Sequence, residues 1–101
     1  MKRLVQSWVQ AEKEHYGETL AQAIRRMNEK HGTHLTSSRV SEWRRGVYSP
    51  SQISISHMFY RTLPWALKQA GIAATAAQLS ALKKCIWLIE IKDGREFIEM
   101  L

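Results

Sequence analysis

The chain has 101 residues, a formal net charge of +6 and one cysteine. This length suits one domain with a small appendage, and such a chain buries enough surface to fold without a metal or disulfide. The apolar share of 45% with four tryptophans excludes a disordered chain. The lone Cys85 excludes an internal disulfide framework and suits a reducing compartment. Because no signal-peptide core follows Met1 and no apolar run could cross a bilayer, we expect a cytoplasmic protein without a membrane partner.

The charge is unevenly distributed along the chain. Residues 1–89 hold 13 Lys and Arg against five acidic residues, whereas residues 90–101 hold two against four. A basic body favours a polyanionic partner, and an acidic end suggests a separate role. Ordinary solubility charge is the alternative interpretation, because a modest net charge is usual for small domains.

Apolar residues at helical spacing predict a first helix over residues 3–16, ended by Gly17. Its inward stripe consists of Leu4, Trp8, Val9, Ala11 and Tyr16, with Lys and Glu on the opposite side. A second helix is predicted over residues 18–31, and Gly32 suits the left-handed residue that closes it. Its apolar stripe consists of Leu20, Ala21, Ala23, Ile24 and Met27, and its outward basic residues are Arg25, Arg26 and Lys30.

A short third helix is predicted over residues 37–45, between a Thr36 N-cap and Gly46. Val40 and Trp43 are three positions apart, so they share one face and can anchor the helix against the second helix. The opposite face carries Ser37, Ser38, Ser41 and Glu42, flanked by Arg39, Arg44 and Arg45.

This outer face suits the major groove of DNA. Small side chains let the helix backbone approach the base edges, and flanking arginines reach phosphates on either side. The free amide groups behind the Thr36 cap add another phosphate site. Solvated surface charge is the alternative for the arginines. Glu42, which repels phosphate, either accepts from a cytosine amino group or pairs with Arg39 or Arg45.

Residues 47–52 predict a turn, after which Ile53 begins a fourth helix. We predict a separate fifth helix from a Thr62 cap to Gly71, because Pro64 is tolerated early in a helix and not inside one.

The pattern changes after Gly71. Residues 74–84 favour a helix, and residues 86–91 are rich in β-forming side chains. Because Asp93-Gly94 is a favoured two-residue turn, we predict a short C-terminal β-hairpin. A helix that continues to Ile89 is the alternative, since Leu79, Leu82, Ile86 and Ile89 also fit a heptad seam.

The stretch from Val40 to Ser51, VSEWRRGVYSPS, resembles the end of the recognition helix and the following loop in lambda-repressor/Cro-like (XRE) helix-turn-helix proteins. Leu20-Ala21 is similar to the Leu-Ala that opens the family's second helix. The resemblance implies a mainly α, five-helix DNA-binding domain, which we assign to residues 1–72, followed by a C-terminal interaction segment over residues 73–101. Ala21 and Thr36 are farther apart than in the family, so either the second helix is extended or the turn is expanded through residues 31–34.

The resemblance and the pattern of the third helix together imply a role for each residue. The residues expected to read bases are Ser37, Ser38, Ser41 and Glu42. Those expected to contact the DNA backbone are Thr36, Arg39, Arg44, Arg45, Tyr48 and Ser49. The structural anchors are Val40, Trp43 and Gly46.

Nothing in the sequence indicates a catalytic or metal centre. His31 and His34 are three apart, but no second pair of ligands is near them, and zinc sites use about four ligands. Cys85 adjoins Lys84 and an apolar run, which favours a buried or interface thiol over a nucleophile. We therefore expect no enzymatic activity, no cofactor and no metal.

Residues 74–101 carry more apolar side chains than a small helix-turn-helix monomer needs, and an exposed patch of this kind marks an interface. A two-fold dimer reads two half-sites about one turn apart, which a single helix cannot do. We therefore predict a homodimer, with interface residues Leu79, Leu82, Ile86, Trp87, Ile89 and Phe97. The alternative is that the segment only covers the first and fifth helices.

These patterns predict a sequence-specific regulator of transcription that binds double-stranded DNA as a dimeric repressor of its own or a neighbouring operon. Two alternatives stay open. The chain is an antitoxin whose residues 74–101 bind a toxin, or it is a protein–protein adaptor that keeps the helical fold without binding DNA.

Overall fold

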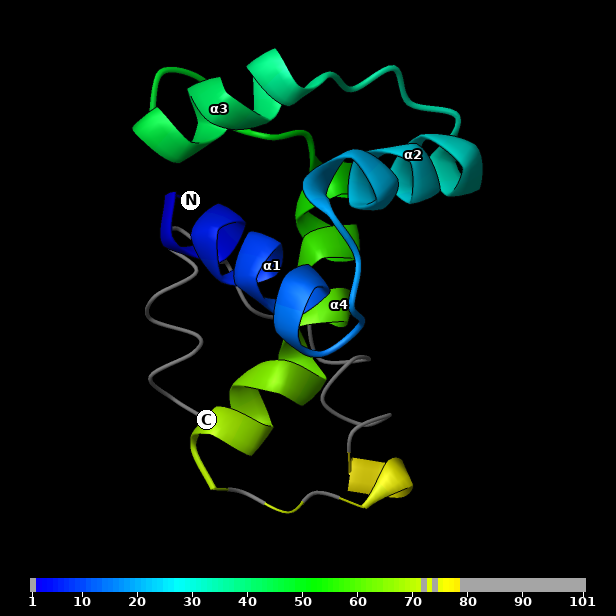
Figure 1. The fold of residues 1–101 in the computed structure, drawn as a ribbon, viewed down its shortest axis with the longest axis vertical. Helices are drawn as coiled ribbons and strands as arrows, with labels where there is room; N and C mark the ends of the chain where they lie inside the picture. The colour runs from blue at the N-terminus through cyan, green and yellow to red at the C-terminus, as the bar shows by residue number, and fades with distance from the viewer. Residues whose placement is uncertain (1, 72, 74, 79–101) are drawn as a thin grey trace.

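The computed structural model describes residues 2–71, 73 and 75–78, which form a mainly helical structure without a strand. Its four long helices are α1 (Lys2–Glu14), α2 (Leu20–His31), α3 (Ser37–Arg45) and α4 (Gln52–Gln69). In Figure 1, α1 lies across α4, and α2 and α3 lie at the end of the molecule where α4 begins. No helix in the described part of the chain is long and apolar enough to cross a bilayer.

Several predictions concern residues outside these ranges. They are the hairpin around Asp93-Gly94, much of the helix at 74–84, and the interface residues Leu79, Leu82, Ile86, Trp87, Ile89 and Phe97. All of them remain predictions from the sequence.

Side-chain caps and glycines set the ends of α2 and α3. Thr19 Oγ1 accepts a hydrogen bond from Gln22 N while Gln22 Oε1 accepts one from Thr19 N, which makes a capping box. Thr36 Oγ1 accepts from Arg39 N at 3.2 Å. Gly46 ends α3 in the left-handed conformation, with φ at 76°. The predicted bounds and caps of α3 are therefore confirmed.

One side chain, Asn28, fixes the connection between α2 and α3. Its Oδ1 accepts from Leu35 N at 2.9 Å and from Thr33 Oγ1 at 2.7 Å, and its Nδ2 donates to Leu35 O at 3.0 Å. Helix α2 extends to His31, and a non-helical stretch then runs to Thr36. The helix therefore ends where predicted but begins two residues later, at Leu20, and the connection to α3 is expanded.

One hydrophobic core joins all four helices. Trp8 of α1, Met27 of α2, Trp43 of α3 and Met58 of α4 are each at most 3% exposed. The apolar stripes predicted for the first two helices supply most of this core. The prediction that Ala21 belongs to the apolar stripe is wrong, because Ala21 is exposed on the outward side of α2.

The predicted fourth and fifth helices are a single helix. Helix α4 runs from Gln52 to Gln69 with Pro64 inside it, so the predicted break at Thr62 is wrong. Thr62 Oγ1 donates to Met58 O at 2.6 Å, a bond within α4, instead of capping a new helix. Side chains on both sides of the proline are buried, and their packing offsets the missing backbone hydrogen bond. Figure 1 shows α4 changing direction along its length, as a helix with an internal proline does.

A charged pair is buried between α1 and α4. Glu12, predicted on the outer side of its helix, is 1% exposed, and its Oε1 accepts from Arg61 Nη2 at 2.8 Å and from Arg61 Nε at 2.9 Å. The guanidinium also lies over the Tyr16 ring, 3.5 Å from its centroid, and 3.7 Å from Glu18 Oε2. Arg61 thus contacts two acids and a ring, and these contacts join the end of α1 to α4.

His57 is a second buried titratable group. It is 3% exposed, its Nδ1 lies 3.0 Å from His31 Nε2, and its Nε2 has no hydrogen-bond partner among the described residues. Burial, followed by the nearby His31 and the cations Lys30 and Arg61, lowers the pKa of His57 to about 4. The imidazole is therefore neutral in the folded protein at neutral pH.

Candidate nucleic-acid interface

Helix α3 is divided into a buried and an exposed side. Val40 is 0% exposed and Trp43 is 3% exposed, and both pack in the core. Ser37, Ser38 and Ser41 are all exposed, as the sequence predicted. The outer side of α3 is therefore a row of short polar side chains, on which another molecule can come close to the helix backbone.

Arginines extend this outer side toward the end of α3. Arg44 and Arg45 are exposed, and neither forms an ion pair with a described residue. Arg45 follows Ser41 by four positions and Ser38 by seven, so it shares their face. Arg45 thus projects outward in line with the serines, whereas Arg44 lies nearer the edge of the buried side.

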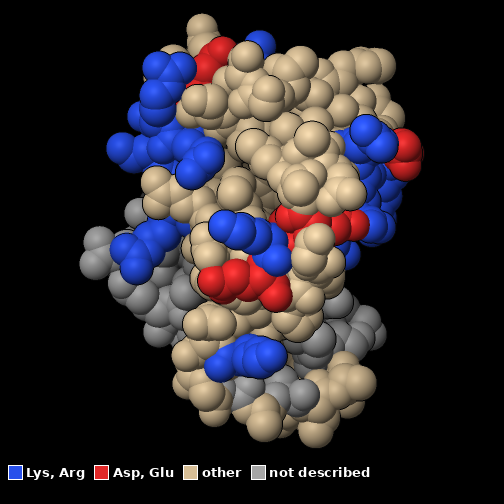
Figure 2. Space-filling model, viewed as in Figure 1, with Lys and Arg blue, Asp and Glu red and all other residues tan. Residues whose placement is uncertain are grey.

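The start of α1 adds two cations that were not among the predicted site residues. A Cβ at Gly46 would lie 2.8 Å from Lys2 Cδ, so the Lys2 side chain crosses the end of α3. Lys2 and Arg3 are both exposed. Figure 2 shows Lys and Arg side chains gathered at the upper left, where Figure 1 places one end of α3 and the start of α1. The basic run after Met1 was the sequence signal, but only the fold brings it to α3.

Glu42 pairs with Arg39, one of the two partners considered from the sequence. Arg39 Nη1 lies 3.6 Å from Glu42 Oε2, and the Arg39 guanidinium lies over the Tyr48 ring, 5.1 Å from its centroid. The three side chains form a layered cluster at one border of the exposed side of α3, with Arg44 at the other border. The cluster neutralises the one acidic group on this surface.

The remaining predicted residues lie at the two ends of α3. Thr36 is exposed, and its hydroxyl oxygen already accepts from Arg39 N. Ser49 is exposed in the loop after α3, next to the buried Pro50. Val47 and Tyr48 in the same loop are each 55% exposed, which makes this loop unusually apolar for a surface.

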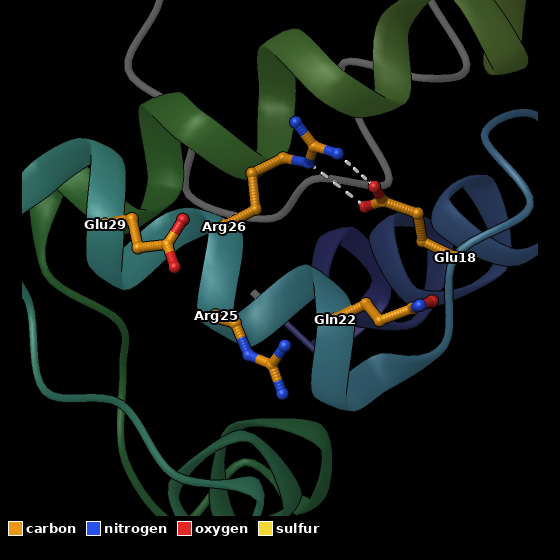
Figure 3. Close-up of a pocket in the computed structure, with 5 residues that line it drawn as sticks. All are labelled: Glu18, Gln22, Arg25, Arg26 and Glu29. Atoms are coloured by element: carbon orange, nitrogen blue, oxygen red, sulfur yellow. Dashed lines mark hydrogen bonds and ion pairs between the residues drawn. The ribbon is translucent and has the colours of Figure 1, made fainter.

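The outward side of α2 carries a shallow pocket lined by Glu18, Gln22, Arg25, Arg26 and Glu29. In Figure 3, Arg26 reaches Glu18, to which it donates through Nε at 3.1 Å and also through Nη2, whereas Arg25 points away. This pair lowers the pKa of the Glu18 carboxyl and raises the pKa of Arg26. Because two acids and two arginines line the pocket, it offers little net charge to a ligand. Of the two arginines, Arg25 is the one without a charge partner among the described residues.

The two histidines considered as a metal pair are separated. His31 faces His57 in the core, whereas His34 is exposed in the connection to α3. Within the described ranges, no group of three or more His, Cys, Asp or Glu side chains could hold a metal ion.

Comparisons with models of known protein families, with curated proteins and with solved structures find no match to this chain. The resemblance of residues 40–51 to lambda-repressor/Cro-like proteins therefore remains an inference from that stretch.

Proposed function

We propose that this protein is a sequence-specific DNA-binding regulator of transcription that places α3 in the major groove. The observation that carries the proposal is the division of α3 into a side anchored by Val40 and Trp43 and an exposed side of serines bordered by arginines. An α-helix fits the width of the major groove. Short side chains on its outer side let the backbone come close to the base edges.

In this proposal the residues around α3 make two kinds of contact. The base-facing residues are Ser37, Ser38, Ser41 and Glu42. The backbone-facing residues are Thr36, Arg39, Arg44, Arg45, Tyr48 and Ser49, with Lys2, Arg3 and Arg25 as additions from the fold. Arg44 and Arg45 have no ion pair with a described residue to break before they bind a phosphate, so no such contact offsets the gain from counterion release.

We further propose that the protein binds DNA as a homodimer and acts as a repressor. One recognition helix contacts only a few base pairs, whereas a two-fold dimer binds two half-sites about one helical turn apart. We assign dimer formation to the apolar residues of 79–101 on the grounds of their sequence.

Selection of duplexes from a randomised pool by the full chain tests this function. We expect the recovered duplexes to share one motif with two related half-sites about one turn apart. Affinity for the motif should fall with salt, with a log–log slope of about −0.9 for each phosphate contacted. A pool that stays random, with binding that depends only on salt, would contradict sequence-specific recognition.

A charge-matched pair of variants separates contact by α3 from the effect of net charge. The variant Arg44→Ala/Arg45→Ala removes two cations from α3, and Lys13→Ala/Lys68→Ala removes two exposed cations from the far ends of α1 and α4. We expect the first to weaken binding about tenfold or more, and the second to change it little. Equal losses in the two variants would mean that α3 has no special place in binding.

A further inference from the structure

We propose, resting on the DNA-binding function above, that Glu42 and Arg39 together recognise one G·C base pair. Glu42 accepts a hydrogen bond from the cytosine N4 amino group, and Arg39 donates to guanine O6 and N7. This moves Arg39 from the backbone contacts of the proposed function above to base recognition.

The Arg39–Glu42 contact is an ion pair in which the Glu42 carboxylate accepts no hydrogen bond from Arg39. Arg39 Nη1 and Glu42 Oε2 are 3.6 Å apart, which is an ion pair but too long for a hydrogen bond. Oε2 is shielded from solvent and accepts no hydrogen bond within the described part of the chain. A base donor therefore meets the carboxylate through Oε1, on the exposed part of the Glu42 side chain, while Oε2 keeps its contact with Arg39. The adjacent guanidinium at the same time reduces its repulsion of DNA phosphates.

Tyr48 restrains the arginine. Its ring lies under the Arg39 guanidinium, 5.1 Å from centroid to Cζ, so that the guanidinium is held between the ring and the carboxylate. The Arg39 side chain is still 50% exposed and the Glu42 side chain 27% exposed. Both groups can therefore meet a base, and less ordering entropy is lost when they do.

The order of acceptor and donors on Glu42 and Arg39 is complementary to only one kind of base pair. Across the major groove, a C·G pair presents the cytosine N4 donor and then the guanine O6 and N7 acceptors. A carboxylate beside a two-donor guanidinium is the complement of that order. An A·T pair presents its one donor between two acceptors, so a carboxylate on adenine N6 would face the acceptor N7 on one side.

Duplex selection with matched variants of the full chain tests this assignment. With the wild-type chain we expect each half-site to contain a fixed G·C pair. With Glu42→Gln, which exchanges the charged acceptor for a neutral amide while Arg39 still contacts guanine, we expect the preference for this pair to fall by roughly tenfold. With Arg39→Lys, which keeps the charge but loses the planar fork, we expect the preference at that position to fall by roughly tenfold or more while affinity for unrelated duplexes is kept.

Variants at Glu29 and Tyr48 serve as controls. Glu29→Gln makes the same charge change on the exposed side of α2, and it should leave the selected motif unchanged. Tyr48→Ala should weaken the preference at the G·C position, with Tyr48→Phe retaining it. The assignment is overturned if either Glu42→Gln or Arg39→Lys keeps the full preference for the fixed pair. A wild-type chain that selects no motif overturns the DNA-binding function itself, which is a different result.

Discussion

The two charged regions of this protein differ in how much of their charge is paired. Where α1 meets α4, Arg61 contacts Glu12, Glu18 and the Tyr16 ring, and on α2 Arg26 is held by Glu18. Around α3, Arg39 pairs with Glu42. At the end where α3 meets α1, Arg44 and Arg45 have no ion pair with a described residue. The first region uses charge to hold helices together. The second leaves the charge of Arg44 and Arg45 available for a partner. The net charge of the chain does not distinguish paired from unpaired cations.

The largest expected effect on stability comes from Arg61→Ala. The substitution leaves the Glu12 carboxylate 1% exposed without its partner. Loss of one member of a buried ion pair costs about 3–5 kcal/mol, and we expect a loss near the lower end because Arg61 is 22% exposed. Urea unfolding monitored by circular dichroism measures it.

The double variant Glu12→Leu/Arg61→Met provides the control. It removes both charges and fills the space with apolar atoms, so we expect it to recover much of the lost free energy of unfolding. If Arg61→Ala costs less than about 1 kcal/mol, the pair contributes no more than an exposed salt bridge.

The second effect is a pH dependence due to His57. Its pKa falls to about 4 on folding from the ordinary value of 6.5, so the unfolded chain binds more protons between these two values. The free energy of unfolding should therefore decrease as the pH falls through this window, by up to about 3 kcal/mol at its lower end. Thermal unfolding at pH 7, 6, 5 and 4 measures the change. In His57→Gln this slope should be flatter; an unchanged slope would assign it to other groups.

The third effect is a difference in DNA affinity between two matched glycine substitutions, Gly46→Ala and Gly32→Ala. Gly46 and Gly32 both have a positive φ, at 76° and 66°, so either change to alanine costs about 1 kcal/mol of strain. Only at Gly46 would the added Cβ meet another group, Lys2 Cδ at 2.8 Å. We expect similar melting temperatures for Gly46→Ala and Gly32→Ala, but weaker DNA binding only for Gly46→Ala, because Lys2 must move. Equal DNA affinity would remove Lys2 from the interface.

The smallest expected effect on stability comes from Arg45→Ala. Because this side chain is exposed and unpaired within the described residues, the free energy of unfolding should change by no more than about 0.5 kcal/mol. DNA affinity should nevertheless fall across all sequences, with a salt slope shallower by about 1. A destabilised variant would show that Arg45 belongs with the paired charges instead.

The sequence was sufficient to predict α3 because local chemistry determines its ends. Thr36 and Gly46 act on their own neighbours, so the helix they enclose has the predicted bounds. Val40 and Trp43 are buried as their spacing indicated. Contacts between segments distant in sequence could not be predicted from local patterns. Lys2 adjoins Gly46 only because α1 crosses the end of α3.

The errors came from treating residue type as a guide to burial and helix breaks. Glu12 follows Trp8 by four positions and therefore lies on the buried stripe of α1. Because glutamate is charged, residue type alone predicts that it faces solvent. Its partner Arg61 is 49 positions away, too far for any local pattern. Pro64 favours a new helix capped by Thr62, whereas tertiary packing keeps α4 continuous through the proline.

The continuity of α4 also sets the distance between the two ends of the molecule. Eighteen helical residues span about 27 Å along the helix path, and the molecule measures 35 Å along its longest axis. Figure 1 places α3 beyond the start of α4 and residues 75–78 beyond its end. If α3 binds DNA as we propose, a partner at the far end of α4 would contact the opposite end of the molecule.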